Sequence, residues 1–115
     1  MMKRGDIHYV NLDPVAGNEV SKTRPAVIVS NDINNEFAGT VTILPLTSTV
    51  TGKNYPFQVT IKKGTANLTK DSRIKADQIR TIDRSRIDSY IGTLDDIIMK
   101  DVDSAILIHL GIRAS

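Results

Sequence analysis

The sequence has no cysteine and no tryptophan, and aromatic residues make up only 4% of its 115 residues. The lack of cysteine excludes disulfides, thiolate metal sites and a cysteine nucleophile. With so few aromatic rings, we do not expect a nucleic-acid-binding surface built mainly on base stacking. No apolar segment follows the positive charges near the N-terminus, and no apolar run approaches the roughly 20 residues of a membrane span. We therefore expect a cytoplasmic protein without a membrane anchor.

The motifs of common metal-dependent and nucleotide-dependent enzymes are also missing. The sequence contains no HExxH, P-loop, GxSxG or GxGxxG pattern. Its two histidines, His8 and His109, stand at opposite ends of the chain and show no metal-ligand spacing. We expect both to be structural, and we expect neither a metal nor a cofactor.

The composition is that of one ordinary globular domain spanning residues 1–115. Hydrophobic residues account for 40% and charged residues for 24% of the chain. The net charge of +2 permits a polyanionic partner without requiring one. A domain this small has a poor surface-to-volume ratio, so burying further apolar surface in a homodimer is a natural expectation.

Short β-type runs separated by turn formers predict most of the secondary structure. Strands are expected at residues 7–12, 26–29, 41–46, 57–61, 72–76, 79–82 and 90–94. The continuous β-branched run 26–29 suits a strand that is buried on both faces. Residues 31–35, rich in Asn and Asp, predict a turn. In 72–83, Lys75 and Asp77 would share one face if they lay on one strand.

The end of the chain has a different periodicity. Apolar residues recur there at helical spacing, at Ile98, Val102, Ala105, Ile106 and Leu110. Thr93 or Asp95 is a candidate N-cap, and Gly111 is a suitable stop. We predict a mainly β fold, a small curled sheet or barrel with a C-terminal helix packed on it.

Three polar segments could carry chemistry. Residues 17–25 gather a carboxylate, hydroxyls, a lysine and an arginine, residues 47–49 are hydroxyl-rich, and 75–83 hold Lys75, Asp77 and Arg80. From the residues alone, a solvated loop, a turn and a surface ion pair are the more common explanations.

Taken in order, however, segments along nearly the whole chain resemble the MazF/PemK family of toxin endoribonucleases. The matching segments are 4–7, 12–14, 17–19, 23–32, 77–83 and 102–105. The resemblance implies a barrel like that of SH3 domains and of the gyrase poison CcdB, with a C-terminal helix. It also implies a homodimer that cuts single-stranded RNA at short motifs without a metal. A cognate antitoxin would inhibit it with an extended, acidic C-terminal tail.

The resemblance also assigns roles to residues. The family's catalytic arginine falls on Arg24, its hydroxyl partner on Thr47 with Ser48 as the alternative, and the glutamate of its Gly-x-Glu motif on Glu19. Asp77 is the alternative proton acceptor. The residues expected to contact RNA are Asn18, Ser21, Lys22, Ser48, Lys53, Lys75, Asp77 and Gln78.

Two other functions fit the same fold. One is a non-enzymatic toxin that poisons a protein target such as gyrase, and the other is a catalytically decayed module that binds RNA or an antitoxin. The first lacks the loop Arg-Pro and Gly-x-Glu motifs that this chain has at Arg24 and Glu19. Because Thr47 is present as well, the nuclease is the favoured hypothesis.

Overall fold

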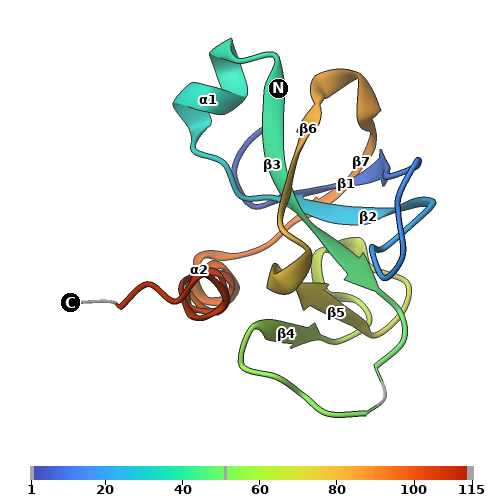
Figure 1. Ribbon diagram of the computed structural model, residues 1–115, viewed down its shortest axis with the longest axis vertical. Coiled ribbons are helices and arrows are strands. Elements are labelled where there is room, and N and C mark those ends of the chain that lie inside the picture. Colours follow the sequence, from blue (N-terminus) through green and yellow to red (C-terminus); the bar gives the residue numbers. More distant parts are fainter. Residues whose placement is uncertain (1, 51, 114–115) are drawn as a thin grey trace.

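A computed structural model describes residues 2–50 and 52–113 of the chain. This part contains seven strands, two α-helices and three short 3₁₀ helices, arranged as in Figure 1. The strands are β1 (Asp6–Asn11), β2 (Thr23–Ile28), β3 (Thr40–Thr47), β4 (Gln58–Ile61), β5 (Ser72–Lys75), β6 (Arg80–Asp83) and β7 (Ile87–Thr93). The α-helices are α1 (Asp32–Phe37) and α2 (Asp96–Leu110), and the 3₁₀ helices are η1 (Thr65–Asn67), η2 (Ala76–Gln78) and η3 (Arg84–Arg86). The predicted mainly β fold with a C-terminal helix is confirmed.

The strands form one antiparallel sheet in the order β4-β5-β3-β2-β1-β7, with β6 also paired to β3. β3 is the centre of this sheet because it changes partner along its length. Its first half pairs with β6 as far as Ile43, and its last two residues pair with β5 from Leu46. Pro45 lies at the change, where the missing N–H costs no ladder bond to either strand.

The two ends of the sheet approach each other through the connection that follows β4. Asn67 of η1 donates from Nδ2 to the carbonyl oxygen of Ile91 on β7, at 3.0 Å. Gly92 is buried against the backbone of Ala66, and a Cβ added at Gly92 would lie 2.2 Å from the Ala66 carbonyl oxygen. Only glycine allows this approach, which curls the sheet towards a barrel.

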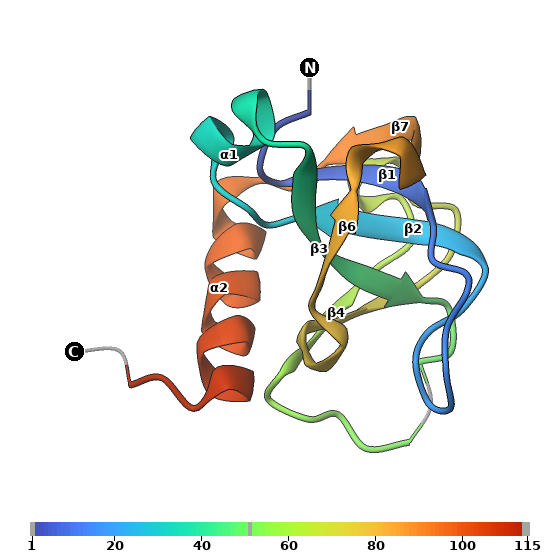
Figure 2. The same ribbon diagram turned by 45° about the horizontal axis from the view of Figure 1, so that its top comes forward.

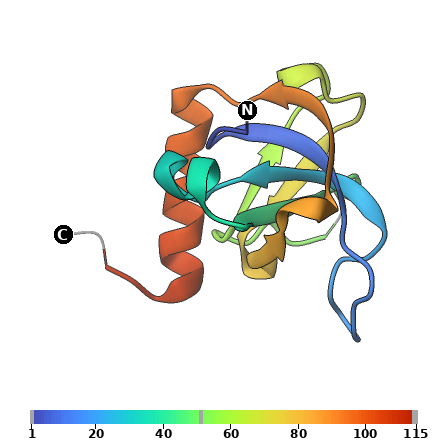
Figure 3. The same ribbon diagram turned by 90° about the horizontal axis from the view of Figure 1, so that it is seen from above.

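Helix α2 covers the side of the sheet opposite the β1–β2 loop (Figures 2 and 3). Asp95 caps it by accepting a hydrogen bond from the Ile98 N–H at 2.8 Å, and Gly111 ends it at φ 70°. Val102 and Ala105 are buried in the core. Leu110, by contrast, is 51% exposed, so the apolar stripe predicted from the sequence extends beyond the face that packs on the sheet. No helix in the described ranges is long and apolar enough to cross a membrane.

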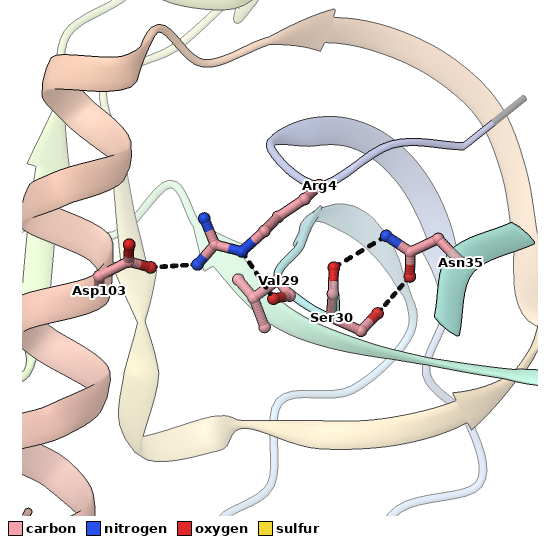
Figure 4. A network of polar contacts seen from close by, with 5 residues as sticks. All are labelled: Arg4, Val29, Ser30, Asn35 and Asp103. Carbon is pink, nitrogen blue, oxygen red and sulfur yellow. Dashed lines mark hydrogen bonds and ion pairs between the residues drawn. The ribbon is translucent and has the colours of Figure 1, made fainter. Parts of the chain in front are cut away.

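The turn predicted at 31–35 is wrong, because helix α1 begins there. Asn31 caps the helix by accepting from the Asn34 N–H at 2.8 Å, so the residues that favour a turn start a helix instead. Asn35 is fully buried and exchanges two hydrogen bonds with Ser30 (Figure 4). In the same network, Arg4 donates to the carbonyl of Val29, the residue after β2, and pairs with Asp103 of α2, which ties the N-terminal segment to the end of β2 and to α2.

Candidate active site

The loop between β1 and β2 holds its shape through its own hydrogen bonds. The Lys22 N–H donates to Asp13 Oδ1 at 3.0 Å, and the Ala16 N–H donates to Glu19 Oε1 at 3.0 Å. Arg24, at the start of β2, donates from Nε to the Ser21 carbonyl oxygen at 2.8 Å. This contact fixes the plane of the guanidinium, and the described residues accept no hydrogen bond from its two terminal nitrogens. Arg24 therefore presents a fixed pair of donors at the base of a loop.

The strand register aligns Arg24 with Thr47. β2 and β3 pair at Ala26 and Pro45, and continuing this register by two residues sets Arg24 opposite Thr47. On its other side, Thr47 pairs directly with Arg73 of β5. Leu46 and Ile74 point into the core, so alternation directs Thr47 and Arg73 to the opposite face. One hydroxyl thus lies between two arginines on neighbouring strands.

Two hollows meet at Arg24 and Thr47, the two residues that line both. The tyrosine hollow, of about 380 Å³, is lined on its far side by Tyr9, Pro25, Leu46 and the segment 67–70. The basic hollow, of about 370 Å³, contains Glu19, Gln58, Arg73 and Lys75. Each is as large as a small-ligand pocket. The arrangement suits an extended anionic chain that runs across Arg24 and Thr47 with a unit in each hollow.

The structure brings together most, but not all, of the residues expected from the sequence. Glu19, Ser21 and Lys75 line the basic hollow, whereas Lys22 and Ser48 line the tyrosine hollow. Four of the predicted residues line neither hollow: Asn18, Lys53, Asp77 and Gln78. Of these, Gln78 accepts a hydrogen bond from the Val20 N–H at 3.2 Å, so it stabilises the β1–β2 loop.

Lys75 and Asp77 do not lie on one strand, which is the condition for them to share a face. β5 ends at Lys75, and Asp77 lies in the 3₁₀ helix η2 that follows. The helical turn breaks the two-residue alternation on which the expectation rested. Lys75 therefore lines the basic hollow, while Asp77 is half-buried outside it, with a buried Oδ1 that has no hydrogen bond among the described residues.

Arg73, Gln58 and Tyr9 belong to the site but were not predicted from the sequence. Arg73 and Lys75 are two residues apart, so the alternation of a strand at 72–76 could have indicated that they share a face. Nothing in the sequence indicates that this face adjoins Thr47, because that follows from the β3–β5 pairing.

Both histidines lie outside the two hollows. His8 is buried, and its Nδ1 lies 3.0 Å from the Asp88 carbonyl oxygen. His109 is exposed on α2, with its ring centre 5.9 Å from that of Phe57. In residues 2–50 and 52–113, no three histidine or acidic side chains gather as possible metal ligands.

Comparison with families of related sequences matches residues 3–110 to the PemK-like, MazF-like toxins of type II toxin–antitoxin systems. Among curated proteins, the endoribonuclease MazF of Staphylococcus saprophyticus is 40% identical over 113 residues, which cover 98% of this chain and 94% of that protein.

Solved structures share the fold over the whole chain. MazF from Deinococcus radiodurans superposes with a TM-score of 0.81 at 28% identity, covering 96% of this chain and 97% of that one. An endoribonuclease from a mycobacterial species, solved in complex with its cognate antitoxin, has a TM-score of 0.81 at 22% identity, with full coverage of both chains.

Proposed function

Because this chain belongs to the PemK-like, MazF-like toxins of type II toxin–antitoxin systems, we propose that it cuts single-stranded RNA at a short motif without a metal ion. Membership of this family, together with 40% identity to an endoribonuclease MazF over the whole chain, makes it an endoribonuclease toxin that a cognate antitoxin inhibits. Beyond this activity, we propose which residues act, how the RNA is cut and that the RNA is single-stranded.

The alignment of Arg24 with Thr47 at the junction of two hollows is the observation that carries the proposal. A guanidinium offers planar donors that match two phosphate oxygens, and a hydroxyl adds a third donor. The scissile phosphate would lie against these two side chains. The nucleotides on either side would then occupy the tyrosine hollow and the basic hollow.

RNA supplies its own nucleophile, the 2′-hydroxyl beside the scissile phosphate. Attack of this oxygen on phosphorus breaks the bond to the 5′-oxygen and leaves a 2′,3′-cyclic phosphate and a 5′-hydroxyl. The protein has to align the groups, accept one proton, return another and stabilise the added negative charge. Arg24, which lines the basic hollow, stabilises that charge.

Glu19 is the stronger candidate for accepting the 2′-hydroxyl proton. It lines the basic hollow together with Arg24 and Thr47, whereas Asp77 does not. Its Oε1 accepts from the Ala16 N–H, which leaves Oε2 as the oxygen that would take the proton. Hydrogen bonding to the loop would hold the carboxylate in place for this step.

The substrate and partners follow from the same site. Single-stranded RNA can present both its backbone and its base edges to the hollows. A protein that cuts cellular RNA would act in the cytoplasm. A twofold homodimer and an antitoxin whose acidic tail covers the basic hollow complete the proposal. The proposed base contacts lie in the loops around the hollows: Asn18, Ser21, Lys22, Ser48 and Lys53.

Incubation with a long single-stranded RNA in the presence of EDTA tests the function, beside the Arg24→Ala variant and a DNA of the same sequence. We expect the wild-type protein to cut only the RNA, with cyclic phosphate ends, and the variant to leave it intact. Primer extension on the products maps the cleavage motif. Intact RNA at high concentrations of the wild-type protein would instead support a non-enzymatic toxin or a decayed binding module.

A further inference from the structure

Arg73 is a charged residue placed inside the sheet beside the proposed site. It belongs to β5, which pairs on one side with β3 and on the other with β4. Its direct neighbours across these strands are Thr47 and Thr60. Its side chain is only 8% exposed, and Nη1 donates to the Lys53 carbonyl oxygen at 3.3 Å. Arg73 is therefore a buried cation that lines the basic hollow beside Thr47.

Three cations surround this hollow. Arg24, Arg73 and Lys75 line it with a single carboxylate, that of Glu19. The positive charges of these side chains repel one another across the hollow, and burial of the Arg73 guanidinium weakens its hydration. An anion placed between these side chains would offset both costs. The charges that line the hollow therefore favour binding of an anion.

We propose that Arg73, assisted by Lys75, forms a second phosphate-binding site, which holds the RNA phosphate next to the scissile one. The inference rests on the proposed function, because it assumes that the scissile phosphate lies at Arg24 and Thr47. Arg73 lines the basic hollow only, whereas those two residues line both hollows. It is a positioning residue that fixes the register of the RNA and does not touch the reacting phosphorus.

Arg24 on β2 and Arg73 on β5 flank Thr47 of β3, one on each side. Adjacent strands lie about 4.8 Å apart, so the backbones of the two arginines are separated by about two strand spacings. Two arginines on the same side of Thr47 would favour a clamp on one phosphate. Arginines on opposite sides, one at the junction and one within the hollow, favour two successive phosphates along the chain.

The test uses an RNA oligonucleotide that contains the mapped cleavage motif, made uncleavable by a 2′-deoxy sugar at the cut site. A neutral methylphosphonate replaces one phosphate at a time on either side of that site. With wild-type protein we expect one flanking replacement to raise the Kd about 10-fold and to reduce the slope of log Kd against log salt by about 0.7, the value for one contact to a single strand. No variant is needed for this arm, so folding cannot confound it.

Arg73→Met should reproduce these two changes on unmodified RNA, and the sensitive methylphosphonate should then have no further effect on the variant. Arg73→Lys should restore the salt slope because it restores the charge. Lys62→Met, which removes an exposed charge beyond the end of β4, is the matched control and should leave the slope unchanged. Circular dichroism checks that each variant is folded.

The second phosphate site would be overturned if Arg73→Met and each methylphosphonate had additive effects on the free energy of RNA binding. A loss confined to kcat would also overturn it, because it would assign Arg73 to the scissile phosphate. Neither result bears on Arg24, whose role is read from cleavage of ordinary RNA in EDTA. Conversely, if wild-type protein does not cut RNA, the salt slopes of wild type and Arg73→Met measured on a long unmodified single-stranded RNA still report whether Arg73 holds a phosphate.

Discussion

Arg24 faces Thr47 across two neighbouring strands when the β2–β3 register is continued from Ala26 and Pro45. The two side chains are the only ones among the described residues that line both hollows. A guanidinium tied down at Nε and a hydroxyl at a strand end are preorganised donors, which need no rearrangement as charge develops on a phosphate. This relationship makes the contributions of the two residues to cleavage separable by substitution.

Arg24→Ala should reduce kcat about 10²- to 10³-fold, the usual effect of removing one preorganised donor. Arg24→Lys should recover little of the rate because an ammonium cannot make the two parallel contacts of a guanidinium. Single-turnover cleavage of an oligonucleotide with the mapped motif measures both. Arg113→Ala, which removes an exposed arginine outside the hollows, is the matched control. Cleavage by Arg24→Ala at the wild-type rate would rule out this site.

Thr47 and Ser48 can be distinguished as the catalytic hydroxyl. Thr47 lines both hollows, whereas Ser48 lines only the tyrosine hollow. We therefore expect Thr47→Ala to lower kcat about 10-fold or more, since it loses a donor to the scissile phosphate. Thr47→Ser should keep most of the rate, and Ser48→Ala should change KM more than kcat. A larger loss of kcat in Ser48→Ala than in Thr47→Ala would reverse the assignment.

Sequence periodicity was enough to predict the elements whose apolar pattern is local. The helix at 96–110 follows from the apolar spacing within it, and of the two candidate caps, Thr93 and Asp95, the structure has Asp95, with Gly111 as the predicted stop. The strand expected at 26–29 is confirmed at the fully buried Ala26, Val27 and Ile28, but β2 begins three residues earlier, at Thr23, and ends before Val29. Helix α1 was missed because Asn and Asp favour both turns and helix caps, and the choice depends on packing around the buried Asn35.

The site itself depends on pairing that no local pattern reveals. Arg24, Thr47 and Arg73 come from three strands far apart in the sequence, and their alignment is set by the strand order and register. The resemblance to a known family pointed to Arg24 and Thr47, but the residues alone favoured an ordinary loop and turn. Arg73 lies outside the matching segments, so only the β3–β5 register shows its position beside Thr47.

Gly92→Ala should destabilise the fold, because the new Cβ would lie 2.2 Å from the Ala66 carbonyl oxygen and the backbone there would have to move. Overpacking of this kind typically costs about 1–3 kcal/mol in the free energy of unfolding. Gly39→Ala is the matched control, since a Cβ there meets nothing within 4 Å. Urea denaturation compares the two. Equal midpoints would show that β7 and η1 do not pack as described.

Asp32→Asn should flatten the dependence of stability on acid pH. The pKa of Asp32 lies below the 3.8 of an unperturbed aspartate, first because it accepts a hydrogen bond from the Arg4 N–H at 2.7 Å, and further through Asn35 and the charges of Lys3 and Arg4. A carboxyl whose pKa is lowered by folding stabilises the native state fully above its unfolded pKa, and loses that contribution as the pH falls through its folded pKa.

The wild-type free energy of unfolding should therefore fall more steeply below about pH 4 than that of Asp32→Asn, and the two proteins should converge in acid. Urea denaturation at a series of pH values measures this. Glu36→Gln, which neutralises an exposed carboxylate on the same helix, is the control and should follow the wild-type slope. Parallel curves for wild type and Asp32→Asn would mean that the Arg4 N–H does not hold this carboxylate in solution.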